Sequence, residues 1–169
     1  MSTHPAQILA IAIALLLLGS APNVGASAVR VLSFSFDLPD SWIVEGNGGD
    51  KLFATGANKM YPPPLVMAEG CVPSGPRQCS GFRRPDPPKE LAQFGCSGAA
   101  GELVERPDQI IETRWICAPV ILDGAKSTAG VSVFEIDGAI LAVSYIAGDA
   151  DVAIPIFLDT LGRSLKVRQ

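Results

Sequence analysis

Apolar and polar residues alternate strictly near the start of the chain, and this pattern predicts a strand with one buried face. Residues 32–38 place Leu, Phe, Phe and Leu at every second position, with Ser, Ser and Asp between them. A period of two over seven residues is typical of a β-strand packed on one side. Extended pieces follow at 42–44, 51–55 and 65–68, separated by breaks rich in Gly, Pro and Asp. We therefore expect the first part of the chain to form several short strands.

The second half of the chain has three longer extended segments joined by tight turns. Residues 110–122 are rich in β-branched side chains, and residues 131–136 and 139–147 are also strongly apolar. Asp-Gly pairs stand at 123–124 and 137–138, where a two-residue turn with positive φ at both positions joins antiparallel strands. Residues 139–147 are apolar on both faces, which predicts a central strand covered on both sides. Together these segments predict an antiparallel meander.

The hydrophobic period changes to that of a helix near the C-terminus. Apolar residues recur at i, i+3, i+4, i+7 and i+11 from Ile154, so we expect a helix that begins near Ala153 with Pro155 in its first turn. A shorter helix of about two turns is predicted in the middle of the chain, capped by Asp86 and closed by Gly95. The predicted fold class is α+β, an antiparallel sheet packed against a long C-terminal helix and a short middle helix.

An apolar run at residues 8–18 suits the core of a secretory leader. This run of Ile, Leu and Ala has 11 residues, whereas a membrane span needs roughly 20. Cleavage fits after Ala26 or after Ala28, and we take residues 1–26 as a signal peptide and residues 27–169 as one domain. A buried N-terminal helix is the alternative, because this leader contains no Lys or Arg. The expected location of the mature domain is periplasmic or secreted.

Four cysteines lie in the expected mature chain, and an even number behind an export leader indicates two disulfides. They are Cys71, Cys79, Cys96 and Cys117, with gaps of 8, 17 and 21 residues. Of the three possible pairings we favour Cys71–Cys79 with Cys96–Cys117, because short loops close most readily in the unfolded chain. The other two pairings stay open. A zinc site is the alternative, but it needs cysteine pairs roughly two to four residues apart.

Charge and composition exclude several classes of function. The chain carries 13 Lys and Arg against 17 Asp and Glu, a net charge of −4, so it lacks the basic excess of a nucleic-acid binder. The single histidine, His4, lies in the predicted leader. A mature domain without imidazole has no Ser-His-Asp or Cys-His catalysis and no histidine metal site. We therefore expect no cofactor, no metal and no catalytic residue.

Carboxylates are the acid–base chemistry that remains. Asp37, Asp40 and Glu45 lie close together in the sequence and could line a sugar site, since glycosidases use two carboxylates. We favour a solvated strand edge for this group. Asp149 and Asp151 precede the C-terminal helix, where helix capping is favoured over catalysis or calcium binding. A carboxylate-based hydrolase is therefore the enzyme alternative.

Two loops carry the residues that we expect to contact a partner. Loop 56–64 contains an aromatic residue beside three consecutive prolines, and such a stiff segment binds at a low cost in entropy. Loop 71–88 combines arginine with phenylalanine, a composition enriched at interaction hot spots. The predicted partner-binding residues are Tyr61, Pro63, Arg77, Phe82, Arg83 and Arg84. The alternative is that both segments are solvated loops that contact nothing.

One short motif points to a known family. The segment Phe34-Ser35-Phe36-x-Leu38-Pro39-x-x-Trp42 resembles the opening of the PsbP-like family. The resemblance continues through the Asp137-Gly138 hairpin and the closing Ser164-Leu165-Lys166-Val167, and it covers most of residues 31–167. This family's fold is shared by a photosystem oxygen-evolving subunit, a Ran-binding import factor and several bacterial envelope proteins. The chain departs from it in its four cysteines and its proline-rich insertion at 71–88.

The resemblance implies a non-catalytic scaffold that grips other proteins, although a fold does not fix a function. Bacterial envelope members of the fold include immunity proteins that block effectors delivered by type VI secretion. Our first hypothesis is an exported, non-enzymatic protein-binding module, in its finer form an immunity or inhibitor protein that neutralises an envelope-targeting toxin. The expected partner is a secreted effector toxin, with no nucleic acid and no transmembrane anchor after leader removal. The alternatives are an envelope structural or assembly factor, the hydrolase, and a small-ligand binder.

Overall fold

The computed structural model describes residues 27–47, 49–56, 63–73, 79, 89–92, 96, 100–106, 110–148 and 152–168. Within these residues the chain forms ten strands and two helices. The strands are β1 (Ser27–Val31), β2 (Phe34–Leu38), β3 (Trp42–Asn47), β4 (Lys51–Gly56), β5 (Leu65–Cys71), β6 (Glu102–Val104), β7 (Ile111–Leu122), β8 (Ala125–Ile136), β9 (Ala139–Gly148) and β10 (Lys166–Val167). The helices are α2 (Lys89–Ala92) and α3 (Ala153–Ser164). The predicted leader, residues 1–26, lies outside the described residues.

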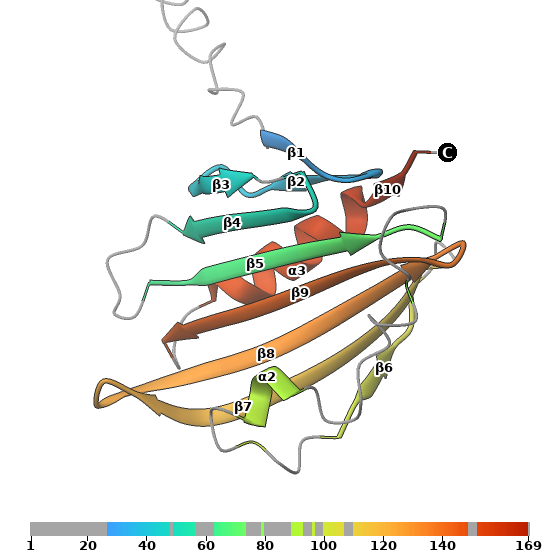
Figure 1. Cartoon of the computed structure of the whole chain (residues 1–169). Helices are drawn as coiled ribbons and strands as arrows, with labels where there is room; N and C mark the ends of the chain where they lie inside the picture. The colour runs from blue at the N-terminus through green and yellow to red at the C-terminus, as the bar shows by residue number, and fades with distance from the viewer. Residues whose placement is uncertain are drawn as a thin grey trace, which may run out of the picture.

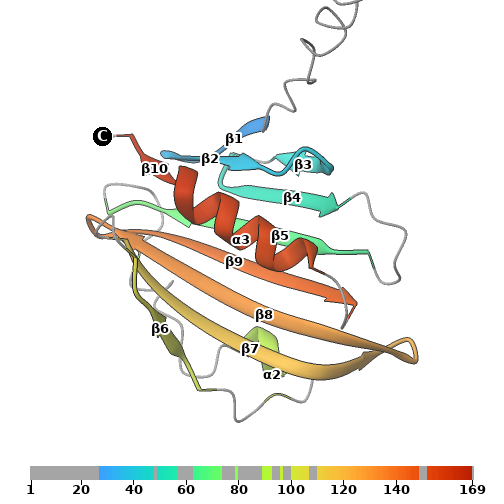
Figure 2. The ribbon, with the colours of Figure 1, turned by 180° about the vertical axis from the view of Figure 1, so that it is seen from behind.

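The strands form two antiparallel sheets. Seven of them make the larger sheet in the order β3-β4-β5-β9-β8-β7-β6, and the smaller sheet has the order β1-β2-β10. The smaller sheet lies above β3 and β4 at one end of the molecule, and α3 lies behind the larger sheet (Figure 1). Figure 2 shows the other side, with α3 in front of β5 and β9. The fold is therefore mostly antiparallel sheet with one long helix.

The meander predicted for the second half is confirmed. β7, β8 and β9 pair in sequence order, and β9 lies between β5 and β8 in the interior of the sheet. Both Asp-Gly pairs adopt the positive φ that two-residue hairpin turns require, for example φ 50° at Asp137 and 77° at Gly138. The apolar residues on both faces of β9 thus identified a central strand correctly.

The helix α3 covers the larger sheet with the stripe that its sequence predicts. Ile154, Phe157, Leu158 and Leu161 are all buried on this stripe. Phe157 packs against Trp42 on β3, with ring centroids 4.9 Å apart. Burial of side chains of this size contributes about 2 kcal/mol each, so the helix is held mainly by this face.

The middle helix is shorter than predicted, whereas the C-terminal helix begins at Ala153 as predicted. The middle helix was expected to run about two turns from Asp86 to Gly95, whereas α2 has four residues, which is a single turn. The prediction used end signals alone, and both Asp86 and Gly95 lie outside the described residues. At the start of α3 the N-cap residue is Val152, which forms no side-chain cap. Asp149 and Asp151, for which we predicted capping, lie outside the described residues.

The strand predicted over residues 32–38 is the second half of a hairpin. Leu32 adopts φ 53° in the turn, and β2 begins at Phe34. β1 pairs along the whole length of β2, from Ser27 opposite Leu38 to Val31 opposite Phe34. Leu32 continues the alternation of apolar and polar residues although it lies in the turn, so the sequence pattern did not reveal where the strand begins.

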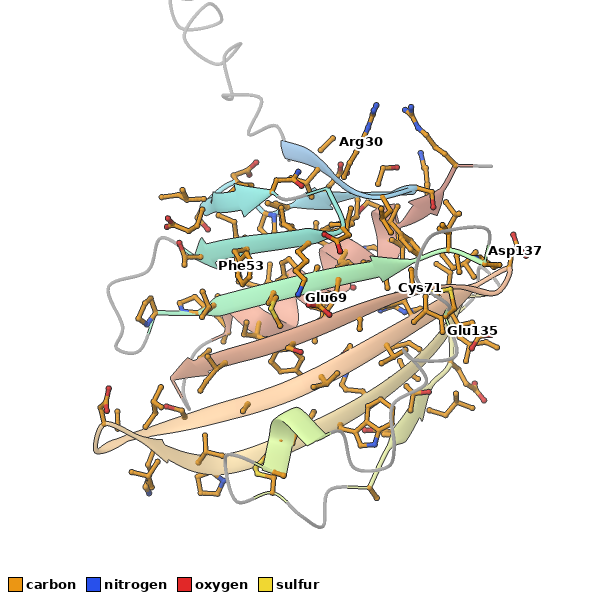
Figure 3. All side chains as sticks on the ribbon, viewed as in Figure 1. Arg30, Phe53, Glu69, Cys71, Glu135 and Asp137 are labelled. Carbon is orange, nitrogen blue, oxygen red and sulfur yellow. A yellow bond between two sulfur atoms is a disulfide. The ribbon has the colours of Figure 1, made fainter. Side chains whose placement is uncertain are left out.

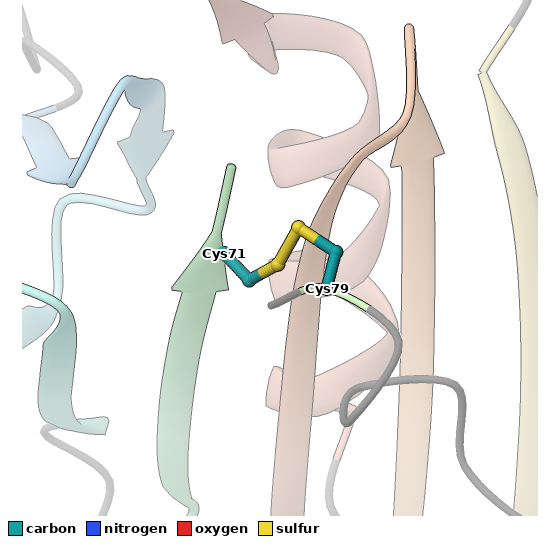
Figure 4. Close-up of a disulfide and its surroundings, with 2 residues drawn as sticks. All are labelled: Cys71 and Cys79. Carbon is teal, nitrogen blue, oxygen red and sulfur yellow. A yellow bond between two sulfur atoms is a disulfide. The ribbon is translucent and has the colours of Figure 1, made fainter. Parts of the chain in front are cut away.

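Two disulfides join the larger sheet to the segments around it. Cys71, at the end of β5, is bonded to Cys79 (Figure 4), and their Cα atoms are 5.5 Å apart. Cys96 is bonded to Cys117 on β7, with Cα atoms 5.9 Å apart. This is the pairing that the short first loop favoured. Each bond ties a segment outside the sheet to a strand inside it.

Candidate functional site

The face of the larger sheet that points away from α3 carries exposed apolar side chains on β3, β4 and β5. The strand register places Ile43 beside Thr55 and Thr55 beside Leu65, while Phe53 lies beside Met67. Ile43 is 56% exposed, Phe53 41% and Leu65 42%. Neighbouring strands lie about 4.8 Å apart, so these side chains form one continuous surface. We call Ile43, Phe53, Leu65 and Met67 the outer patch.

An ion pair borders the outer patch. Lys51 on β4 and Glu69 on β5 face each other in the register and form a salt bridge. Figure 3 shows Phe53 and Glu69 on neighbouring strands of the same sheet. An apolar centre with a polar border is the usual composition of a protein interface.

The other half of the same sheet face is covered. Leu91 of α2 is buried against Trp115, Val131 and other side chains of β7 and β8. The Cys96–Cys117 disulfide adds to this second cluster. In the described part of the chain, no helix or strand packs in the same way over the outer patch. The sheet face is therefore covered around Trp115 and Val131 and open at β3 to β5.

Of the predicted partner-binding residues, the structure places one. Pro63 is exposed and lies two residues before Leu65, at the edge of the outer patch. The remaining predicted residues, Tyr61, Arg77, Phe82, Arg83 and Arg84, lie outside the described residues. Their role in binding stays a prediction.

The three carboxylates considered for a hydrolase are held in different surroundings. Asp37 lies on β2, where its backbone N donates a hydrogen bond of 2.8 Å to Oγ of Ser164. Glu45 lies on β3 and accepts a 3.0 Å hydrogen bond from Oγ1 of Thr55. Asp40 is exposed in the turn between these strands. These hydrogen bonds place Asp37 on the smaller sheet beside α3 and Glu45 on the larger sheet beside β4.

Basic side chains gather on the smaller sheet, a feature that net charge concealed. Arg30 and Lys166 stand on either side of Ser35 in the register. Arg163 and Arg168 complete the basic lining of a surface pocket of about 480 Å³. These residues come from opposite ends of the sequence. The pairing of β1 and β10 with β2, together with the end of α3, brings them to one surface.

A charged cluster lies on the helix-facing side of the larger sheet. Glu112 on β7 is fully buried and holds two arginines. Arg106 places Nε at 2.7 Å and Nη2 at 2.6 Å from its Oε2. Arg114 places Nη2 at 2.7 Å and Nε at 3.0 Å from its Oε1. The guanidinium of Arg106 also lies over the ring of Phe134, 5.5 Å from its centroid. The cluster therefore carries one buried negative charge and two positive charges.

Tyr145 on β9 lies next to this cluster. Burial raises the pKa of the Tyr145 phenol to about 12, and the positive charge of Arg114 opposes the shift. The ring lies against Gly130 on β8, where a Cβ atom would be 2.3 Å from the phenol oxygen. Glycine at this position is therefore what allows the tyrosine ring to rest on the neighbouring strand.

The described residues contain neither a cluster of three or more metal-ligating side chains nor a helix long and apolar enough to cross a membrane. Their polar arrangements include the basic pocket and the arginine cluster beside Tyr145. Sequence reasoning missed both, because neither forms a motif along the chain.

Comparison with solved structures shows the fold. A protein from Bacteroides thetaiotaomicron superposes with a TM-score of 0.58 at 11% identity, over 85% of this chain and 49% of that one. The chain thus spans about half of that protein. LpqN from Mycobacterium tuberculosis, described as involved in cell envelope biogenesis, gives 0.57 at 13% identity, over 89% of this chain and 87% of LpqN.

Cyanobacterial PsbP (CyanoP) from Synechocystis is also similar, with a TM-score of 0.50 at 15% identity, over 90% of this chain and 99% of CyanoP. The expected PsbP-like fold is therefore present, while identities this low show the fold alone. No protein-family model and no curated protein sequence matches the chain.

Proposed function

We propose that this chain is a non-enzymatic protein-binding module outside the cytoplasm, and that it binds its partner through the outer patch. One observation carries the proposal: half of a sheet face is covered by α2 and a disulfide, while the other half presents Ile43, Phe53 and Leu65 to solvent. Contiguous apolar surface with a polar border is typical of protein interaction sites. The two disulfides fit an oxidising compartment such as the cell envelope.

The outer patch suits a partner with an apolar surface and a polar group opposite the Lys51–Glu69 pair. Phe53 lies near the middle of the patch and is its largest side chain, so it is the expected anchor. The rigid sheet beneath the patch keeps the cost of ordering low on binding. Pro63 would extend the contact along one side.

The finer form of the proposal is an immunity or inhibitor protein whose partner is a secreted, envelope-targeting toxin. It rests on the general resemblance to fold members that block such effectors. Cells that lack the chain would then lose protection against one specific toxin, encoded beside it. Growth of the deletion strain together with a toxin-delivering sibling strain tests this directly.

A second candidate function is an envelope structural or assembly factor. The observation that favours it is the similarity in fold to LpqN, which is described as involved in cell envelope biogenesis. In this case deletion would weaken the envelope in the absence of any toxin. Sensitivity to detergent during growth in monoculture distinguishes the two forms.

The experiment that tests the outer patch is capture of envelope proteins by the purified chain. We expect Phe53→Ser and Leu65→Ser to lose the partner that the unchanged chain retains. Ile111→Ser is the matched control, because Ile111 is also an exposed apolar residue but lies on β7, outside the patch. Equal capture by all four proteins would contradict the role of the outer patch, provided that circular dichroism shows each variant to be folded.

A further inference from the structure

A cavity of about 210 Å³ opens between the first turns of α3 and the strands β7, β8 and β9. Its walls include the apolar side chains of Ile116, Ile154 and Leu158. Arg114 and Tyr145 provide polar groups on the same wall surface. Small-molecule sites have this composition, with an apolar lining and a few polar groups that fix orientation.

The cavity has a positive charge at its wall. Glu112 is fully buried and neutralises one of the two arginines that it holds, so the cluster keeps one positive charge in excess. The side chain of Arg106 is 13% exposed and that of Arg114 25%, so the excess is more accessible at Arg114. Nε and Nη2 of Arg114 both donate to Glu112, and within the described residues Nη1 has no hydrogen-bond partner. A donor of this kind beside an apolar wall suits an anion.

The polar groups at the wall are held in place before any ligand arrives. The two hydrogen bonds that Arg114 donates to Glu112 fix the plane of its guanidinium. Gly130 gives the Tyr145 ring its place on β8, because a side chain there would collide with the phenol. Binding therefore requires little ordering of the site, which favours affinity for a small ligand.

We propose that this cavity binds a small monocarboxylate whose apolar body is about the size of one aromatic ring. About 150 Å³ of apolar cavity holds benzene, so a cavity of 210 Å³ accommodates a ring with a short carboxylate-bearing group. The carboxylate would accept a hydrogen bond from Arg114, and the ring would lie against Ile116 and Leu158. This inference is independent of the outer patch, which lies on the opposite face of the sheet.

Titration of the whole domain with phenylacetate, followed by amide NMR, tests the proposal. We expect the largest shifts at Ile116, Thr128 and Tyr145, all of which line the cavity. Phenylacetamide has nearly the same shape without the charge, and it should bind about tenfold more weakly because it loses a charge-assisted hydrogen bond. Equal affinity for the acid and the amide, shifts confined to other surfaces, or no binding at millimolar phenylacetate would overturn the proposal.

A pair of variants places the site on the molecule. Ile116→Glu adds a negative charge at the cavity wall, and we expect it to weaken phenylacetate binding by about tenfold or more. Ile111→Glu makes the same change on the same strand but on the other face, and it should leave binding within about twofold of the unchanged domain. The two isoleucines are 47% and 54% exposed, so both changes are compatible with folding. An equal effect of both variants would also overturn the proposal. Neither variant touches the outer patch, so failure here leaves the capture experiment unaffected.

Discussion

Glu112 is the residue on which the polar part of the interior depends. It is the one fully buried carboxylate among the described residues, and both of its oxygens accept hydrogen bonds from arginine. A buried charge is costly unless it is paired and hydrogen-bonded, so the three side chains stabilise the fold only as a group. Arg106 connects the group to α3, since its guanidinium fills the space that Gly162 leaves open.

Loss of the Glu112 charge should destabilise the domain strongly. We expect Glu112→Gln to lower the free energy of unfolding by about 3 kcal/mol, because two arginines lose their shared counter-charge in a largely buried position. Chemical denaturation measures the change. Asp159→Asn is the matched control: Asp159 pairs with Arg163 on the exposed side of α3, so its effect should stay within about 0.5 kcal/mol. Similar losses for both variants would contradict the account.

The phenol of Tyr145 makes the free energy of unfolding depend on pH above about pH 10. The folded chain holds the phenol proton up to a pKa of about 12, against 10.0 for an unperturbed tyrosine. Between these values the unfolded chain has lost the proton and the folded chain has kept it, so this contribution is complete below pH 10 and is lost as the pH rises to 12. The expected loss is about 2 kcal/mol.

Comparison with Tyr145→Phe isolates this effect. The free energy of unfolding should fall less steeply between pH 10 and 12 in the variant than in the unchanged domain. Parallel pH profiles for the two proteins would show that Tyr145 titrates normally.

At the scale of elements, the strength of local signals decided which predictions held. The Asp-Gly turns and the two apolar faces of β9 are properties of a few neighbouring residues, and the meander that they predict is present. The stripe on α3 likewise fixed both the helix and its buried face. By contrast, β1 carries no comparable signal and is paired only because β2 lies beside it. The single turn of α2 depends on Leu91 packing against β7 and β8, a contact that no local pattern announces.

Each disulfide connects a strand of the larger sheet to a segment outside it. Removing one disulfide at a time measures how much each connection contributes to the stability of the domain. Loop closure predicts a loss of about 3 kcal/mol for a loop of the Cys96–Cys117 length and about 2.5 kcal/mol for one of the Cys71–Cys79 length. We therefore expect the double variant Cys96→Ser/Cys117→Ser to be the less stable of the two double variants in thermal unfolding. The bond at Cys96 also supports the cluster around Leu91, which acts in the same direction. A lower unfolding temperature for Cys71→Ser/Cys79→Ser than for Cys96→Ser/Cys117→Ser would contradict this prediction.

At the scale of the whole molecule, the two candidate sites lie on opposite faces of one sheet. The outer patch is formed by β3, β4 and β5 on the face away from α3, and the cavity lies beneath the start of α3. A protein partner and a small acid could therefore bind at the same time. A substitution at one site can therefore be tested for binding there while the other site stays unchanged.

The candidate sites were harder to predict than the fold. The composition of loop 56–64 predicted a binding role for Pro63, which lies at the edge of the outer patch. The patch itself depends on the register between β3, β4 and β5, and the alternation of apolar and polar residues does not reveal that register. The cavity unites Arg114 on β7 with Tyr145 on β9 and the first turns of α3. Since each of these residues is unremarkable in its own segment, only their meeting in space gives them a chemical role.

The smaller sheet also determines how the domain would respond to mechanical tension. β1 and β10 run parallel to each other on either side of β2, with Ser27 opposite Leu38 and Val167 opposite Phe34. A pull that separates Ser27 from Val167 therefore acts along the strands in opposite directions and loads their hydrogen bonds in shear. Bonds loaded in this way share the force and break together, whereas bonds at the end of a peeled strand break one by one. A tethered domain would keep the larger sheet undistorted until this three-stranded sheet gives way.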